Sequence, residues 1–264
     1  LPRRSLRETA DPDPDIASAD LIYRNRKEFA VGHGVAAEWA DESDGWVNAA
    51  WTEIMPSEQV PRVTPRESAR LSMDFLAESS HGDVTARLKE FLSEYKEWLR
   101  DRASEVDAIE NPHRPVAKDH IKLARKSLAR MEEGVAALED PSVFKAFQFA
   151  NRAMALQRRH SVRIRNKRRN LPIPEEISAN WRPFQIGFVL QALSGLSDPL
   201  HDEREIADLL WFPTGGGKTE AYLGLTAFTI ALRRLREEGQ FESGAGTADI
   251  MRYTLRRLTV QQVQ

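Results

Sequence analysis

Residues 213–219 read Pro213-Thr214-Gly215-Gly216-Gly217-Lys218-Thr219, and regular patterns flank them on both sides. The apolar run over residues 206–212 has the length of a buried strand, and a long apolar helix is predicted from Lys218 to about Arg236. Residues 248–253 predict a further strand. Strand, glycine loop, helix and strand in this order are typical of a parallel α/β unit.

The glycine loop has the composition of a phosphate-binding loop. Glycines let the backbone curl so that several N–H groups converge on phosphate oxygens at the positive end of the following helix. Lys218 would then reach the β- and γ-phosphates of ATP, and the Thr219 hydroxyl would hold Mg²⁺. The sequence therefore predicts ATP and Mg²⁺ as ligands, and Lys218 and Thr219 as the residues that act on the reacting phosphate. The further nucleotide contacts that we predict are Thr214, Gly215, Gly216, Gly217 and Glu220.

Two residues beside the loop leave alternatives open. Glu220 either arranges the metal and its waters or only stabilises the first helical turn through the helix dipole. Phe212 stands where the full phosphate-loop pattern has its first glycine, and the shorter pattern that remains resembles motif I of superfamily 2 helicases. The alternative interpretation is a flexible glycine loop that happens to precede Lys-Thr.

A second segment lies where many helicases place an adenine-sensing motif. It reads Trp181-Arg182-Pro183-Phe184-Gln185. The Gln185 side chain carries both a donor and an acceptor, so it can form paired amide hydrogen bonds with the edge of adenine. We therefore predict Arg182 and Gln185 as nucleotide contacts. The alternative is a glutamine that caps the start of a helix or faces solvent.

The last residues of the chain look like helicase motif Ia, in which the loop and helix after a second strand contact the phosphates of a nucleic-acid strand. Polar and basic side chains there position a backbone without reading its sequence. An ordinary strand followed by a solvated helix is the alternative. The contacts that we predict within residues 251–262 are Arg252, Thr254, Arg256 and Gln261.

Together these segments resemble the DrmA helicases of bacterial DISARM anti-phage systems. The resemblance runs from about residue 20 to the end of the chain. It implies a much longer superfamily 2 helicase with two RecA-like lobes, DNA as its ligand and a DrmB-like protein as its partner. The segments that carry the resemblance are 29–34, 147–154, 182–185 and, most specifically, 211–222.

The middle of the chain predicts a helical accessory region. Apolar residues recur at steps of three and four over residues 84–99 and again over 121–138, so we expect two amphipathic helices packed antiparallel. Pro141 begins a third helix, and a capping box predicts another helix start at Thr64.

The first part of the chain predicts a loose arm over residues 1–20 and then a small sheet. One strand is expected within residues 21–31 and one within 46–54, where the alternation would bury the tryptophans on one sheet face. The fold class is therefore α/β, with the first part of a RecA-like lobe preceded by a mainly helical accessory region with a small β element. The predicted domains are 1–63, 64–175 and 176–264.

A run of positive charge ends the helical region. Residues 141–174 hold nine Lys or Arg and no Asp or Glu. Such a run releases counterions when it neutralises phosphates, so it predicts a contact with the DNA backbone. A solvated connector, or a face that pairs with the acidic remainder of the chain, is an equal alternative. The arginines that we predict to contact nucleic acid here are Arg163, Arg165 and Arg168.

Composition excludes several classes of protein. The chain has 264 residues, of which 41% are hydrophobic and 30% are charged, as in folded globular proteins. The formal net charge of −2 gives no bulk preference for nucleic acid. The absence of cysteine excludes disulfides and fits a reducing cytoplasm, and no apolar run approaches the roughly 20 residues that span a bilayer. Because the sequence begins with Leu1 rather than Met, we expect it to be part of a longer protein.

Three function classes remain. The leading hypothesis is an ATP-dependent DNA helicase or translocase, in which hydrolysis drives movement along a strand. The first alternative is a nucleotide-gated DNA-binding or loading scaffold with little motor activity. The second is a phosphate-loop ATPase unrelated to helicases.

Overall fold

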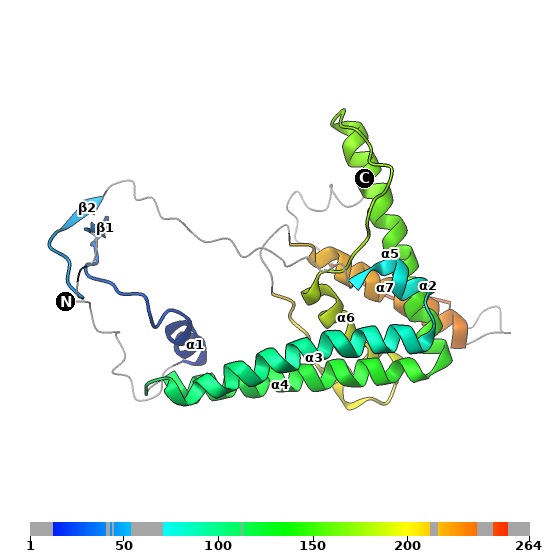
Figure 1. Ribbon diagram of the computed structural model, residues 1–264, viewed down its shortest axis with the longest axis horizontal. Helices are drawn as coiled ribbons and strands as arrows, with labels where there is room; N and C mark the ends of the chain where they lie inside the picture. Colours follow the sequence, from blue (N-terminus) through cyan, green and yellow to red (C-terminus); the bar gives the residue numbers. More distant parts are fainter. Residues whose placement is uncertain are drawn as a thin grey trace. The chain divides into compact units, whose positions relative to one another are not determined.

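The computed structural model describes residues 13–40, 43, 45–53, 71–111, 113–211, 216–236 and 245–252. These residues are mainly helical (Figure 1). Their contacts divide the chain into two units, which are Leu1–Val63 with Trp98–Arg125, and Thr64–Glu97 with Lys126–Gln264. The elements are α1 (Pro14–Ile22), β1 (Ala36–Trp39), β2 (Ala50–Glu53), α2 (Met73–Glu78), α3 (His81–Glu105), η2 (Val106–Ala108), α4 (His113–Ala136), η3 (Ala137–Glu139), α5 (Pro141–Arg168), α6 (Pro183–Ser197), η4 (Asp202–Glu205) and α7 (Lys218–Arg236).

In the first unit, the prediction of a loose arm over residues 1–20 is wrong for the residues described there. α1 has Pro14 at its first position, and the Asp13 side chain accepts a hydrogen bond from the backbone N–H two residues on, at 2.8 Å. A capping aspartate followed by proline is a helix-start signal, although the same composition also suits an irregular segment. Leu21 then anchors α1 in a small apolar cluster with residues of η2 and α4.

The predicted small sheet is present in this unit. β1 and β2 pair antiparallel in a register that places Trp39 opposite Ala50. The strand expected within residues 21–31 does not form, and residues 26–32 have no regular structure. Phe29 packs instead edge-on against Trp39, with the ring centroids 5.8 Å apart.

The tryptophans of this region do not form the buried sheet face that the alternation predicts. Trp46 and Trp51 are 55% and 46% exposed. Strands of four residues offer little surface on which another layer could pack. The alternation of apolar and polar residues is therefore present, but the apolar side chains are not buried.

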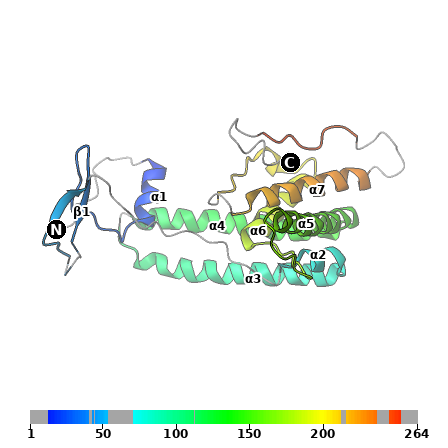
Figure 2. The same ribbon diagram turned by 90° about the horizontal axis from the view of Figure 1, so that it is seen from above.

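The predicted amphipathic helices are confirmed as α3, α4 and α5, of which α5 lies wholly in the second unit and α3 and α4 lie partly in each unit. Val84, Leu88 and Leu92 on one face of α3 are buried, as the three- and four-residue spacing requires. α3 and α4 run antiparallel side by side (Figure 2). An ion pair of 3.7 Å between Lys96 and Glu132 joins them.

The start of α5 is fixed by Asp140. Its Oδ1 accepts a hydrogen bond from the Ser142 N–H at 2.7 Å, and its Oδ2 lies 3.1 Å from the Arg236 guanidinium at the end of α7. The Arg236 guanidinium also donates to the Ser197 carbonyl at the end of α6. Partial burial pushes the pKa of Asp140 upward, but the Ser142 N–H and Arg236 outweigh it and hold the pKa below its ordinary value of 3.8.

Replacing Asp140 by alanine is expected to lower the free energy of unfolding at neutral pH by about 0.5–2 kcal/mol, because the cap and the ion pair are both lost. A lowered folded-state pKa contributes stability above the unfolded value of 3.8, and that stability is lost as the pH falls through the folded value. The difference between wild type and variant should therefore narrow below pH 3.8 in urea unfolding. Asp140→Asn, which keeps a capping side chain, is the control. If wild type and Asp140→Ala differed in free energy of unfolding by the same amount at neutral and acid pH, the lowered pKa assigned to Asp140 would be contradicted.

Two close contacts hold α6 and the segment after it against α4. A Cβ on Gly134 would overlap the Leu190 carbonyl oxygen, so only glycine lets the two helices approach this far. The Arg130 guanidinium donates to both carboxylate oxygens of Asp208, at 2.6 and 2.8 Å, and also pairs with Glu203. These contacts fix the chain that leads toward the glycine loop.

Two predicted strands are wrong for the residues that the structure describes. Residues 206–211 and 248–252 have no regular structure, and Leu209 and Trp211 are 90% and 75% exposed. A buried parallel strand needs neighbours for its N–H and C=O groups, and β1 with β2 form the single sheet among the described residues. The RecA-like α/β class therefore stays a prediction.

The helix predicted after the glycine loop is confirmed as α7, with the bounds expected from the sequence. The predicted helix start at Thr64 lies outside the described residues. The domain boundaries after residues 63 and 175 stay predictions. Within the described ranges, every helix is too short or too polar to cross a bilayer.

Candidate functional site

The described part of the glycine loop, Gly216 and Gly217, leads directly into α7. Gly217 has a φ of +92°, which L-residues with side chains rarely adopt. A Cβ at this position would lie 2.7 Å from the Gln185 Nε2 and 3.1 Å from the Arg182 Nη1. Backbone conformation and close packing both require glycine here.

The segment that contains Arg182 and Gln185 supports this loop from the start of α6. The Gln185 Nε2 donates a hydrogen bond to the Gly217 carbonyl at 2.7 Å, and the Arg182 guanidinium donates to the Gly216 carbonyl. The Gln185 Oε1 accepts from the Arg182 backbone N–H at 2.8 Å, which satisfies this N–H at the start of α6. Two carbonyls of the loop are therefore held by side chains more than thirty residues earlier.

Gln185 is 4% exposed, so its amide is committed to the protein interior. The predicted contact with adenine is not tested by this arrangement. It would have to use the second amide hydrogen and the second lone pair of the side chain, because the first of each is already bonded. Sequence reasoning brought Arg182, Gln185 and the glycine loop to one site, and the structure places them together.

Trp181 anchors this support in the core. Its indole N–H donates to the Asn151 Oδ1 at 2.7 Å, and the Asn151 Nδ2 donates to the Phe147 carbonyl at 2.8 Å. On the other side, a Cβ on Gly224 would lie 2.8 Å from the Trp181 ring. The indole therefore lies between α5 and α7 and fixes the position of Arg182, the next residue. The backbone N–H of Trp181 donates to the Leu71 carbonyl at 2.9 Å.

The roles of Asn151 and Gly224 were missed by sequence reasoning. One signal was available for Asn151, which is a polar residue on the apolar face of a helix and is 1% exposed. Such a residue must have a buried hydrogen-bond partner. Gly224 within an apolar helix signals close packing, but its partner is not visible from the sequence.

Lys218, Thr219 and Glu220 form the first turn of α7 and are partly buried. Their backbone N–H groups lie at the positive end of the helix, where anions are stabilised. Glu220 shares a small cavity of about 90 Å³ with Arg182, Gln185 and Arg158. This volume is far below the 300–1,000 Å³ typical of small-molecule pockets, so the cavity is too small to hold a nucleotide.

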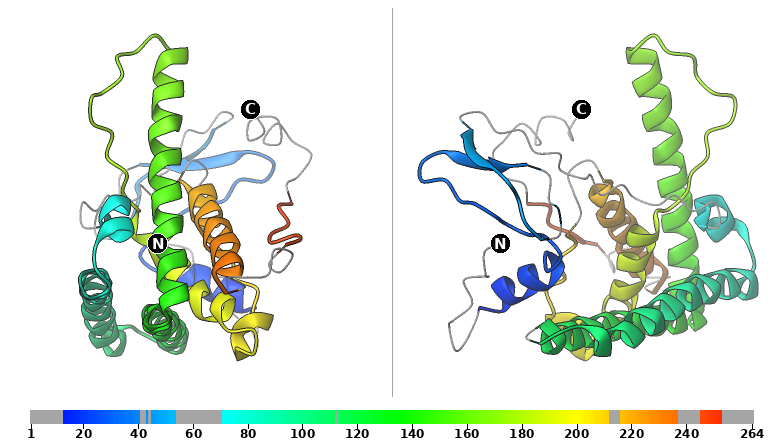
Figure 3. Two further views of the ribbon diagram at one scale, coloured as in Figure 1. Left: turned by 90° about the vertical axis from the view of Figure 1, so that its right-hand side faces the viewer. Right: turned by 60° about the vertical axis from the view of Figure 1, so that its left-hand side comes forward.

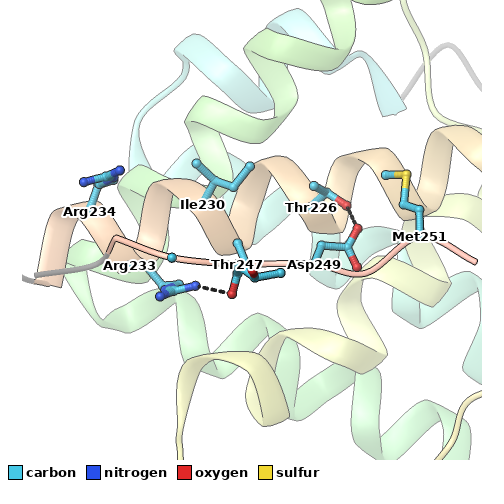
Figure 4. Close-up of a pocket in the computed structure, with 9 residues that line it drawn as sticks. Thr226, Ile230, Arg233, Arg234, Thr247, Asp249 and Met251 are labelled. Carbon is cyan, nitrogen blue, oxygen red and sulfur yellow. Dashed lines mark hydrogen bonds between the residues drawn. The ribbon is translucent and has the colours of Figure 1, made fainter. Parts of the chain in front are cut away.

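A larger depression of about 540 Å³ lies along the second half of α7 (Figure 4). Its wall is the segment 245–252, which α7 holds through two side chains. Thr226 donates to the Asp249 carboxylate at 2.7 Å, and Arg233 donates to the Thr247 and Ala245 carbonyls at 2.8 and 2.7 Å. These contacts hold residues 245–249, part of which was predicted as a strand, against α7. None of them involves the glycine loop.

The remaining predicted residues are placed as follows. Arg163, Arg165 and Arg168 are exposed on the last turns of α5, and Arg252 is exposed. Among the described residues, no three His, Asp or Glu side chains are grouped to hold a metal ion. Binding of Mg²⁺ by Thr219 therefore stays a prediction. The predicted site residues outside the described ranges are Thr214, Gly215, Thr254, Arg256 and Gln261.

Gly217→Ala is expected to lower the free energy of unfolding by about 1–3 kcal/mol, because alanine is strained at positive φ and its Cβ meets the Gln185 amide. Gly82→Ala is the matched control. Gly82 lies in α3, where an added Cβ would meet only the Ser80 Oγ at 4.0 Å, so alanine there should raise stability by about 0.4–1 kcal/mol. Urea unfolding measures both changes, and a shift of the same sign in both variants would contradict the close packing inferred at Gly217.

Together these contacts define a candidate anion site at the start of α7, with a glycine loop supported by a buried glutamine and an arginine. No family model matches the chain. It is 34% identical over 263 residues to the DISARM protein DrmA of Bacillus paralicheniformis, and the match covers 92% of this chain and 23% of that protein. The chain is therefore a DrmA-like protein, a partial homologue that spans about a quarter of the relative's length. The resemblance found in the sequence is confirmed.

Proposed function

We propose that this chain supplies the ATP-binding part of a DNA helicase or translocase that acts in anti-phage defence. The observation that carries the proposal is the support of the glycine loop by Arg182 and Gln185, immediately before Lys218-Thr219 at the start of α7. The defence role rests on the similarity to DISARM protein DrmA. A DrmB-like partner and a cytoplasmic location belong to the same proposal.

The hydrogen bonds to the loop carbonyls have a consequence for phosphate binding. A trans peptide is planar, so the N–H of the next residue points opposite to each carbonyl. Since Arg182 and Gln185 hold the carbonyls of Gly216 and Gly217, the N–H groups of Gly217 and Lys218 point away from these side chains. We propose that the phosphates bind on that side, where α7 presents its N-terminus.

In this arrangement Lys218 balances the charge of the β- and γ-phosphates, and Thr219 is the residue that would hold Mg²⁺. The metal would neutralise charge that develops on the phosphate oxygens during transfer to water. The protein residues supply position and charge, which is where most of the catalysis in phosphoryl transfer comes from. Glu220 lies in the same turn and favours the helix start through the dipole.

This function is tested by measuring ATP hydrolysis by the full-length protein with and without single-stranded DNA. The proposal predicts hydrolysis that DNA accelerates. Hydrolysis at one rate with and without DNA would contradict the motor and favour the nucleotide-gated scaffold. Absence of both binding and hydrolysis of ATP would contradict both functions.

A further inference from the structure

One face of α5 combines positive charge and apolar side chains along almost its whole length. Six residues at successive steps of four, three, four, seven and four lie on this face of the helix, opposite its buried side. All six are exposed. The members of this cationic stripe are Lys145, Phe149, Arg152, Leu156, Arg163 and Lys167.

The stripe is not needed for the core. The buried residues of α5, among them Phe147, Ala150 and Met154, lie on the opposite face and pack within the second unit. Phe149 and Leu156, in contrast, are 53% and 49% exposed. Figure 3 shows that the last turns of α5 extend beyond the neighbouring helices, with the following segment returning beside them. The stripe therefore continues onto a part of the helix that is open to solvent.

The positive charges of the stripe have no acidic partners among the described residues. Arg159 lies at the edge of the same face, between Leu156 and Arg163, and is left out of the stripe because it pairs with Asp74 at 2.6 Å. Lys145, Arg152, Arg163 and Lys167 form no such pair with any residue that the structure describes. Residues 141–174 contain no Asp or Glu, so the helix itself cannot supply one. The sequence left two equal alternatives, which were a contact with DNA and pairing with the acidic remainder of the chain. The absence of acidic partners among the described residues favours binding of an external anion.

We propose that the cationic stripe binds the backbone of single-stranded DNA. The stripe covers 22 residue steps of helix from Lys145 to Lys167, or about 33 Å, which matches about ten nucleotides at the stacked rise of 3.4 Å. Four cations would contact phosphates, and Phe149 offers a ring face to a base. No side chain pattern here reads base edges, so binding is independent of sequence.

An acidic helix of a partner protein is the competing occupant. A partner helix packs through a continuous apolar seam at steps of three and four. In the stripe, cations interrupt the apolar positions at Arg152 and Arg163, and burying them in such a seam would carry a desolvation cost. A phosphate backbone leaves the cations partly hydrated and needs no continuous seam. The alternation therefore favours the nucleic acid.

The inference rests on the proposed function for the choice of DNA, and it assigns a surface outside the nucleotide site. It also revises the residues predicted from the sequence. Arg163 belongs to the stripe, whereas Arg165 and Arg168 point to other sides of α5, because they lie two and five residues further on. We expect Arg163 to contribute more to binding than either of them.

The test is the affinity for a fluorescein-labelled oligo(dT) of about 20 nucleotides, measured by anisotropy without nucleotide in salt of roughly 0.05–0.2 M. One variant replaces Lys145, Arg152, Arg163 and Lys167 by glutamine. The matched control carries the same four-charge change at exposed positions of α3 and α4, namely Lys89, Lys118, Lys122 and Arg125. A third variant, Arg152→Lys with Arg163→Lys, keeps the charge.

The stripe variant is expected to bind on the order of a hundredfold more weakly at about 0.1 M salt, with the slope of log K against log salt reduced by about 3. The control and the charge-keeping variant should bind like wild type. If the stripe variant and the control bound the oligonucleotide with equal affinity, the inference would be overturned. An acidic partner protein would then be the better candidate for this surface. DNA-stimulated ATP turnover together with that equality would leave the proposed function standing. DNA binding through the stripe without any ATP turnover would support the inference about the stripe and contradict the proposed function.

Discussion

Lys218→Ala is expected to slow ATP hydrolysis by about a hundredfold to a thousandfold, the cost of removing one group that stabilises charge in a transition state. Lys218 begins α7, directly after the carbonyl that Gln185 holds, so its position is fixed by the support of the loop. Its ammonium group would lie against the β- and γ-phosphates, and alanine cannot replace that charge. Steady-state hydrolysis of Mg-ATP measures the effect.

Lys89→Ala is the control for this prediction, because it removes one charge from an exposed position of α3. It should hydrolyse ATP at the wild-type rate. Equal turnover in the Lys218 and Lys89 variants would mean that the loop is not the site of phosphate transfer.

Trp181→Ala is expected to lower the free energy of unfolding by about 3–5 kcal/mol. The indole is 2% exposed and fills the space between α5 and Gly224 of α7. Alanine leaves a cavity there and also leaves the Asn151 Oδ1, bonded at 2.7 Å in the wild type, without its donor. Because Arg182 follows directly, the loss should also displace the support of the glycine loop and reduce ATP turnover.

Urea unfolding separates these contributions. Trp211→Ala, at a tryptophan that is 75% exposed, should change stability by no more than about 0.5 kcal/mol. Trp181→Phe keeps most of the ring but not the N–H, so it should cost about 1–3 kcal/mol through the unpaired Asn151. A Trp181→Ala variant as stable as Trp211→Ala would contradict the packing described here.

The helical part of the fold was predictable because its signals are local. The spacing of Val84, Leu88 and Leu92 places all three on one face of a helix whatever its surroundings, and α3 has that face buried. The strands were not predictable in the same way. An apolar run such as 206–211 becomes a strand only when other strands pair with it, and its exposed Leu209 has no such neighbour among the described residues.

The candidate site was predictable in its parts. Glycines before Lys218 indicated a phosphate loop, and Gln185 was singled out by its place before that loop. The hydrogen bond from Gln185 to the Gly217 carbonyl was not predictable, because it joins residues 32 apart in the chain through the packing of α6 beside α7. The contact of Gln185 with the base stays a prediction, and the structure adds a supporting role of this side chain for the loop backbone.

Hydrogen–deuterium exchange with and without Mg-ATP tests the central proposal most directly, because it reports on the loop amides themselves. If the start of α7 holds the phosphates, Mg-ATP should slow exchange in peptides that cover residues 216–221, and Lys218→Ala should remove this protection. ATP that binds and protects other segments, with exchange at residues 216–221 unchanged, would contradict the assignment of the nucleotide to this loop.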